Sequence, residues 1–301
     1  LIDMASIMTC LEKAIQTDYS VVADMYAGNL PSDLRPMDLP AYLYGSFSGI
    51  AVTLFNLVPA LTSTFGISAL PAVTAAWVGG NKTHIKRNIE SVMRITSIVA
   101  FPAGFGIAMM AQPIAEFVFY KVPQEAAIGG DLLQILGIAA IFVALATPIN
   151  SILQAMGRVD IPVKLLVLGG AVKLAANYML IQIPSVNIQA APYGTLLCYM
   201  IIITISMIVL TRTIQSQLRW GSVFIKPLTA AVLCGITARV SYDLISRASD
   251  SLFIVIFAIV LGGIIYAISL ILLRGICKED VLMLPMGEKV AKLLEKHHLL
   301  G

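Results

Sequence analysis

The residue of this chain whose chemistry is most informative is a lysine inside an apolar stretch. Lys173 interrupts residues 165–183, which otherwise have the composition of a membrane-spanning helix. An unpaired ammonium in hydrocarbon is costly, so the side chain must face a partner or a water-filled cavity. Gly169, Lys173 and Asn177 are spaced by four residues and share one helix face. This face predicts one of two roles for Lys173. It could help to bind a substrate anion, or it could pair with a carboxylate or a helix C-terminus and so only stabilise the bundle.

Two further pairs of polar residues have the same i, i+4 spacing. Asn150 and Gln154 precede Arg158 near the end of an apolar stretch. They predict either contacts to a substrate or hydrogen bonds between neighbouring helices. Arg239 and Asp243 are opposite in charge, so mutual neutralisation is the simplest account of both residues. We retain Asn150, Gln154, Arg158 and Arg239 as candidate substrate-binding residues.

Asp3 and Asn56 complete the candidate substrate-binding set, because each is a polar residue in an apolar helix that could line a cavity. The sequence contains no His, Asp and Ser grouping, no HExxH pattern and no glycine-rich phosphate loop. Its four cysteines lie singly, without the spacing of metal ligands. We therefore expect a membrane protein that is not an enzyme and that has no cofactor, no metal site and no nucleic-acid partner.

Membrane helices must position these residues. Hydrophobic residues make up 58% of the 301-residue chain, whereas soluble domains are roughly 45 to 50% apolar. Because one crossing takes about 20 apolar residues, the sequence predicts an all-α integral membrane bundle with about seven full spans. The predicted spans are residues 39–81, 95–115, 132–157, 165–183, 190–211, 224–245 and 251–273. Residues 184–187, which begin with proline and end with asparagine, predict the turn between the fourth and fifth spans.

The first predicted span is unusually long, since residues 39–81 contain no Asp, Glu, Lys or Arg. A helix of this length would reach about 60 Å at about 1.5 Å per residue. It must tilt, kink near Pro59 or Pro71, or extend beyond the membrane. The polar residues within 62–68 predict a bend at that point. A re-entrant or double crossing is the alternative.

The basic residues predict the orientation of the bundle. If the spans alternate, the loops of one side hold most of the lysines and arginines, and the other side holds Lys121 and Arg247. By the positive-inside rule the strongly basic side is cytoplasmic, and the C-terminus lies there. The loops of this side are residues 79–94, 156–164, 212–226 and 274–301. Within the last of them, residues 276–301 predict a short amphipathic tail on the cytoplasmic face.

The apolar stretch at residues 1–11 is too short to cross a membrane. We expect it to be part of one truncated span, whose beginning belongs to a missing N-terminal portion.

Several segments of the sequence, taken in order, carry a resemblance to a known family. They are LYG at residues 43–45, FNLVP at 55–59, SALPAV at 68–73, NSILQAMGR at 150–158, AAPYGTLLCY at 190–199 and LPMGE at 284–288. Together they resemble the stage V sporulation protein B type of polysaccharide flippases. That type belongs to the MOP superfamily of multidrug, oligosaccharidyl-lipid and polysaccharide exporters, which are MATE-like transporters.

The resemblance implies a division of the chain. Residues 1–213 would form the second lobe of a two-lobe transporter, with its first helix truncated. Residues 214–275 would form two additional transmembrane helices, and residues 276–301 the cytoplasmic tail. The N-terminal lobe of the same protein would be the partner that completes the central cavity.

The resemblance also implies a function. A flippase of this type would move a lipid-linked saccharide or cell-wall precursor across the plasma membrane by alternating access. The lipid bilayer and the lipid-linked saccharide would be its partners. One alternative is a multidrug or cation antiporter of the same superfamily, which would need buried carboxylates such as Asp3 or Asp243. The other alternative is a membrane glycosyltransferase, which would need a catalytic acid or base cluster on an outer loop.

Overall fold

The computed structural model describes residues 2–80, 82–215, 221–247, 253–273 and 275. Among these residues every element is helical and no strand occurs. Seven helical stretches are long and apolar enough to cross a membrane, so the predicted all-α bundle with about seven spans is confirmed. The seven stretches are Pro36–Val78, Lys82–Met109, Pro123–Ala155, Asp160–Leu180, Asn187–Ile214, Val223–Ser246 and Ile254–Leu272. The predicted tail, residues 276–301, lies outside the described residues.

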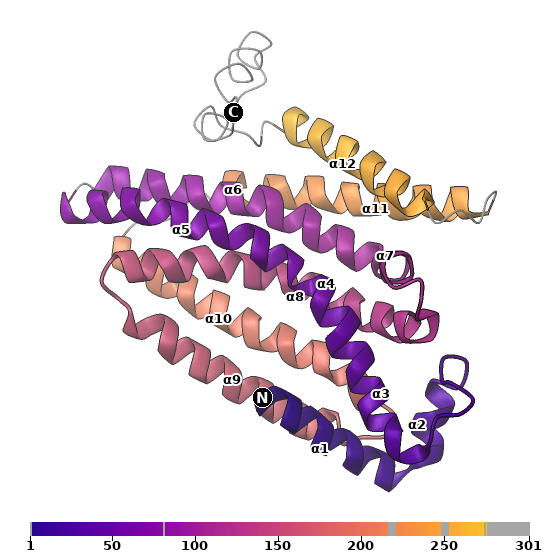
Figure 1. The fold of residues 1–301 in the computed structure, drawn as a ribbon. Helices are drawn as coiled ribbons and strands as arrows, with labels where there is room; N and C mark the ends of the chain where they lie inside the picture. Colours follow the sequence, from indigo (N-terminus) through magenta and orange to yellow (C-terminus); the bar gives the residue numbers. More distant parts are fainter. Residues whose placement is uncertain (1, 81, 216–220, 248–252, 274, 276–301) are drawn as a thin grey trace.

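The elements follow the chain in a simple order (Figure 1). The α-helices are α1 (Ile2–Thr17), α2 (Tyr19–Met25), α3 (Leu39–Gly45), α4 (Val52–Phe55), α5 (Leu57–Val78), α6 (Lys82–Met109), α7 (Ala111–Val118), α8 (Pro123–Ala155), α9 (Asp160–Leu180), α10 (Ala190–Ile214), α11 (Lys226–Ser246) and α12 (Ile254–Leu272). Two short 3-10 helices, η1 (Pro36–Asp38) and η3 (Asn187–Gln189), precede α3 and α10, and two π-helical segments, η2 (Ser46–Ala51) and η4 (Gly221–Ile225), precede α4 and α11.

Helix α8 is the centre of the bundle. It packs against α5, α6, α7 and α10, and Figure 1 shows it between α5 and α6 on one side and α10 and α9 on the other. The contact with α6 is close, because a Cβ atom at Gly137 would lie 2.6 Å from the backbone nitrogen of Ala108. At its C-terminus Gly157 has a φ of 81°, and its N–H donates to the carbonyl of Gln154. This left-handed glycine ends the helix in a Schellman-type cap.

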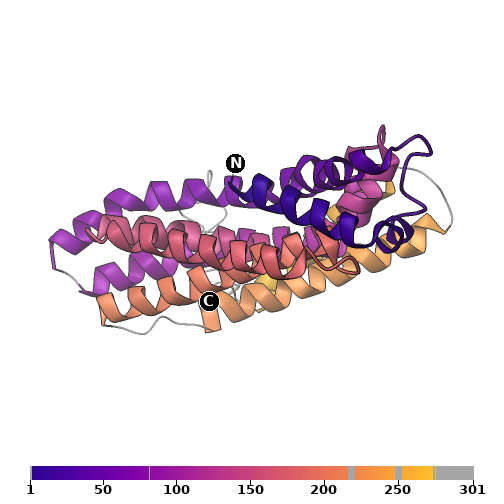
Figure 2. The same cartoon turned by 90° about the horizontal axis from the view of Figure 1, so that it is seen from below.

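Helix α8 contributes to the two larger of the three apolar clusters that the described residues form. One cluster joins α1, α3 and η2 to the first part of α8, with Leu43 and Leu133 fully buried. The other joins α6 and α10 to the later part of α8, with Ile89 and Ile149 fully buried. Figure 2 shows the helices running along the length of an elongated bundle. The two clusters therefore follow one another along the same central helix.

The long first span is broken before Pro59, one of the two prolines near which the sequence predicts a kink. The α-helical pattern is interrupted by the π segment Ser46–Ala51 and again at Asn56, and Figure 1 shows the chain changing direction between α3 and α5. The break ends shortly before Pro59, the third residue of α5. Pro71 lies inside α5 without ending it.

The predicted bend at residues 62–68 is wrong. The hydroxyl of Thr62 donates to the carbonyl of Val58 at 3.2 Å, and those of Ser63, Thr64 and Ser68 donate to carbonyls three residues earlier. Each hydroxyl is thus satisfied within its own helix, which is a common solution for Ser and Thr in membrane helices. The polar patch leaves α5 continuous.

A buried asparagine fixes the turn between α9 and α10, which the sequence predicts at residues 184–187. Asn187 has a φ of 40°, and its side-chain oxygen accepts a hydrogen bond from the Tyr26 hydroxyl at 2.6 Å. Its side-chain nitrogen donates to the carbonyl of Pro184 at 2.9 Å. Burial raises the pKa of the Tyr26 hydroxyl. The turn is confirmed, and it is tied to the end of α2.

Candidate functional site

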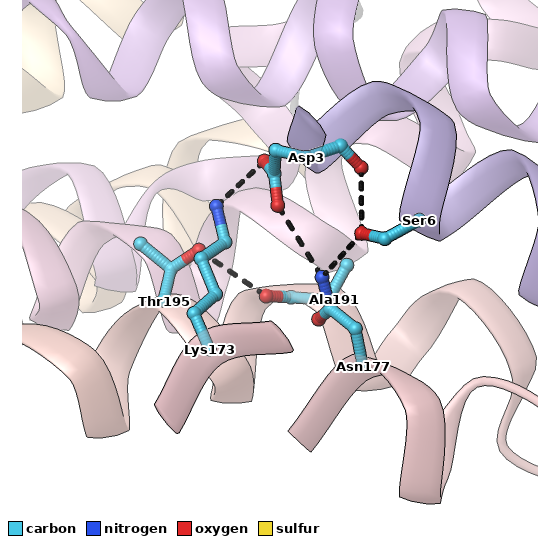
Figure 3. A network of polar contacts seen from close by, with 6 residues as sticks. All are labelled: Asp3, Ser6, Lys173, Asn177, Ala191 and Thr195. Carbon is cyan, nitrogen blue, oxygen red and sulfur yellow. Dashed lines mark hydrogen bonds and ion pairs between the residues drawn. The ribbon is translucent and has the colours of Figure 1, made fainter. Parts of the chain in front are cut away.

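Lys173 forms an ion pair with Asp3 inside the bundle. Its ammonium lies 2.7 Å from the Oδ2 atom of Asp3, and Figure 3 shows the two side chains meeting between α1 and α9. Lys173 is the fourteenth residue of α9, about 20 Å along the helix at about 1.5 Å per residue. An ammonium at this depth needs a partner, and Asp3 supplies it across 170 residues of sequence.

Asn177 lies one turn beyond Lys173 and extends the polar network. Its Nδ2 atom donates to Asp3 Oδ1 at 3.3 Å and approaches Ser6 Oγ at 3.5 Å. The hydroxyl of Ser6 in turn donates to the backbone carbonyl of Asp3 at 2.9 Å. Lys173 and Asn177 of the predicted α9 face therefore contact one face of α1 (Figure 3). Gly169, the third residue of that face, packs against Cys198 and Ile202 of α10 instead.

The network is not fully satisfied. Asn177 is completely buried, and its Oδ1 atom has no hydrogen-bond partner among the described residues. This oxygen points toward α10, where a Cβ atom at Gly194 would come within 2.9 Å of it. Thr195 of α10 lies beside the network in Figure 3, but its hydroxyl donates to the carbonyl of Ala191 at 3.2 Å. Gly194 lets the two helices approach around the buried amide.

The exposure of the ion pair is uneven. The side chain of Lys173 is 21% exposed and that of Asp3 is 44% exposed. The carboxylate therefore opens to the outside of the described bundle, while the ammonium lies behind it. The pair has no net charge, and the ammonium of Lys173 can bind another anion if the carboxylate of Asp3 moves away from it. The described residues contain no group of three His, Cys, Asp or Glu side chains placed to hold a metal ion.

The other predicted site residues do not join this network. Asn150 accepts a hydrogen bond from Ser206 at 3.4 Å, which links α8 to α10. Gln154 and Arg158 are exposed at the end of α8. Asn56 is exposed at the helix break. For Asn150 the structure supports the alternative of a hydrogen bond between helices, and its place among the candidate substrate-binding residues stays a prediction.

Arg239 is engaged elsewhere in the bundle. Its Nε atom lies 3.1 Å from Asp243 Oδ2, and its Nη1 atom lies 3.5 Å from the carbonyl of Met109 at the end of α6. The mutual neutralisation predicted from the i, i+4 spacing is confirmed. Arg239 therefore connects α11 to α6, and its role in substrate binding stays a prediction.

Ser6 is the residue of the network that the sequence reasoning missed. It lies three residues after Asp3 and so shares the same face of α1. That spacing is a signal that could have identified Ser6. The proximity of Thr195 has no such signal, because α10 approaches the network only through the packing at Gly194.

Comparisons with known proteins agree with this architecture. The model of the family described as lipid II flippase MurJ matches residues 49–273. The lipid II flippase MurJ of Bacillus subtilis (strain 168) is 27% identical over 123 residues, which cover 41% of this chain and 23% of that protein. An uncharacterized membrane protein of Methanocaldococcus jannaschii is 23% identical over 220 residues, covering 73% of this chain and 41% of its own length.

A solved structure shares the fold. The structure of the lipid II flippase MurJ in an inward closed conformation matches with a TM-score of 0.50 and 17% identity, covering 76% of this chain and 46% of that one. The chain thus spans less than half the length of these relatives. Because the family model covers well over half of the sequence, the chain belongs to the family of the lipid II flippase MurJ.

Proposed function

We propose that this chain is part of a flippase that moves a lipid-linked saccharide or cell-wall precursor across the plasma membrane by alternating access. The observation that carries the proposal is the match of the family model over residues 49–273. The relative from Bacillus subtilis is named as a lipid II flippase, which favours a lipid-linked cell-wall precursor as the substrate class. The sequence segments that resemble the stage V sporulation protein B type support the narrower proposal that the chain belongs to that branch.

Within such a flippase, residues 1–213 would form the second lobe, residues 214–275 two additional helices, and residues 276–301 a tail. The limited share of each relative that the chain covers supports this division. An N-terminal lobe would then complete the cavity.

We propose that the strongly basic ends of the helices, and the C-terminus, face the cytoplasm. The ammonium of Lys82 at the start of α6 lies 2.8 Å from the side-chain oxygen of Gln215 at the end of α10. This contact supports the orientation, since it joins two loops that the alternation of spans assigns to the same side.

Lys173 and Asn177 are the residues we assign to the substrate. The diphosphate or phosphate group of a lipid-linked sugar must leave the headgroup region, and charge-assisted hydrogen bonds can replace the water it loses. Because Asp3 holds the ammonium in this structure at 2.7 Å, substrate binding would exchange one anion for another. The carboxylate of Asp3 would then compete with the substrate phosphate for the ammonium of Lys173 and would neutralise that charge between transport events.

The structure gives less support to the alternative function, a cation antiporter, which would need carboxylates that can bind the coupling ion. Asp3 and Asp243 are each paired with a base, at 2.7 Å and 3.1 Å. Ion coupling through either residue would first have to break its pair, so the flippase is the better-supported function.

The test is a flipping assay in liposomes with the protein that contains this chain and its N-terminal lobe, using fluorescent lipid-linked sugars and an impermeant quencher. The protein should flip the labelled lipid, and Lys173→Ala should slow flipping by roughly 10- to 100-fold, since a hydrogen bond to a charged group is worth about 1.5 to 3 kcal/mol. Lys164→Ala is the matched control, because Lys164 is exposed and paired with Asp160. Absence of flipping by the intact protein would refute the flippase proposal. Full activity of Lys173→Ala would refute the role of Lys173 alone.

A further inference from the structure

An open groove lies between α8, α10 and the π segment η4, away from the Asp3 and Lys173 network. Its volume is about 340 Å³, and its walls include Phe142 of α8, Ile208 of α10 and Phe224 of η4. Among the described residues, the polar side chains that line it are those of Thr204 and Thr211. Their hydroxyls donate to the backbone carbonyls of residues 200 and 207 at 2.6 Å and 2.9 Å. The walls of the groove that these residues form are therefore apolar, and both threonine hydroxyls already donate to the backbone and have no hydrogen left for a ligand.

An exposed arginine follows the groove residues along α10. Thr204, Ile208 and Arg212 are spaced by four residues, so they follow one another along the same face of α10. Thr204 and Ile208 line the groove, and Arg212 is the exposed residue one turn further on. The stretch from Thr204 to Arg212 covers about 12 Å at about 1.5 Å per residue. An extended chain in the groove would thus bring its polar end close to a positive charge.

A second cation lies at the same end of α10. The ammonium of Lys82 contacts Gln215, the residue that follows α10, at 2.8 Å. Gln215 is neutral, so this contact leaves the charge of the lysine uncompensated. Neither Lys82 nor Arg212 has an ion-pair partner among the described residues. The sequence between residues 161 and 242 contains no Asp or Glu.

We propose that this groove binds an anionic glycerophospholipid. One acyl chain lies against α8 and α10, and the phosphate and the anionic headgroup meet Arg212 and Lys82. Apolar walls next to uncompensated basic residues are complementary to a lipid of this charge, because each Lys or Arg near a membrane surface adds attraction to anionic lipids. The site shares no residue with the Asp3 and Lys173 network, so it is separate from the proposed transport site.

The test is photo-crosslinking in phosphatidylcholine nanodiscs with a phosphatidylglycerol that carries a diazirine on its acyl chain. Crosslinked peptides, identified by mass spectrometry, should concentrate on residues 203–211 and 142–145. Unlabelled phosphatidylglycerol should compete about 30-fold better than added phosphatidylcholine, from a roughly fivefold preference for each of two cations. In the double variant Lys82→Gln, Arg212→Gln this preference should fall close to one. Ile208→Trp, which fills the groove, should abolish labelling of α10.

Lys164→Gln is the matched control, because Lys164 is a basic residue already held by Asp160 at 2.7 Å. It should leave both the labelled residues and the lipid preference unchanged. The proposal would be overturned by labelling spread evenly over the helices, by a preference that survives in the double variant, or by an equal loss in Lys164→Gln. Competition by inorganic phosphate as strong as that by the lipid would also overturn it, since the site would then bind a free anion.

Discussion

The pair formed by Asp3 and Lys173 should contribute to the stability of the bundle in a way that a double-mutant cycle can measure. Loss of one partner from a buried pair costs about 3 to 5 kcal/mol, whereas an exposed pair contributes about 0.2 to 1 kcal/mol. Here the ammonium is 21% exposed and the carboxylate 44% exposed, so the pair lies between these limits. We expect a coupling free energy of about 2 kcal/mol between Asp3→Asn and Lys173→Met.

The direction of each single effect follows from the chemistry. Lys173→Met leaves a carboxylate without its counter-charge, and Asp3→Asn leaves a mostly covered ammonium facing an amide. Each single variant should therefore lower the free energy of unfolding, while the double variant should lose less than the sum of the two. The free energies can be measured by reversible unfolding in mixed micelles.

The control for this cycle is the pair formed by Lys164 and Asp160. Its nitrogen and oxygen are also 2.7 Å apart, but the side chains are 75% and 56% exposed. The same cycle at these positions should give no measurable coupling, because solvent screens an exposed pair. Additivity at Asp3 and Lys173 to within about 0.5 kcal/mol would show that depth in the bundle does not strengthen the contact, and would refute the reasoning.

Three further predictions concern the packing and the turns. Tyr26→Phe should lower the free energy of unfolding by about 0.5 to 1.5 kcal/mol, because Asn187 Oδ1 loses the hydroxyl donor at 2.6 Å and keeps the N–H of Ile188. Since the folded-state pKa of Tyr26 is raised, thermal unfolding should show this tyrosine's stabilisation below pH 10 and its loss as the pH rises further. Gly137→Ala should cost about 1 to 3 kcal/mol through a clash 2.6 Å from the α6 backbone, whereas Gly106→Ala, which meets nothing within 4 Å, should be neutral in the same micelle assay. The pKa of Asp18 is lowered by hydrogen bonds from the Ser20 hydroxyl and the Val21 N–H, so we expect Asp18→Ala to fray the start of α2 at neutral pH. Once the pH falls below the folded-state pKa of Asp18, the helix content of the variant, measured by circular dichroism, should equal that of the native chain.

Most of the fold could be predicted from the sequence because the membrane makes composition decisive. Charge-free stretches correspond to five of the seven spans. The stretches at residues 165–183 and 224–245, which charged residues interrupt, still form α9 and α11. The turn at residues 184–187 was visible because proline and asparagine favour a break in an apolar run. These features depend on local composition, which a single sequence contains.

The position of the helix break was not predictable in the same way. Residues 62–68 have the hydroxyls that indicate an irregular helix, yet those side chains satisfy their own backbone. The actual break begins at Ser46–Ala51, where the apolar side chains of Phe47 and Ile50 are buried against other helices. Tertiary packing decides the geometry there, and no local pattern indicates it.

The candidate site shows the same division. An expensive lysine in a span predicts that a partner exists, and Asp3 fulfils that prediction. The sequence alone did not distinguish an anionic substrate, a carboxylate and a helix terminus as the partner of Lys173. Asp3 and Lys173 are 170 positions apart, and only the packing of α1 on α9 brings them together. Asn150 and Arg239 had equally good local spacing, but their helices face other neighbours.

The π segment at Ser46–Ala51 keeps the rotational register of the first long span. Each residue advances an α-helix by about 100°, and a π turn holds one residue more than an α turn. Deleting one residue here would allow the segment to close into a regular α-helix. Because the wide turn and the α turn that replaces it each complete one revolution, the part before it would keep its orientation relative to α5. The buried Leu39 and Leu43 would stay in the core they share with α8. The same deletion inside α5 would instead turn the flanking part by about 100°, so the π segment is a place where the first span can absorb a one-residue change in length without changing its buried face.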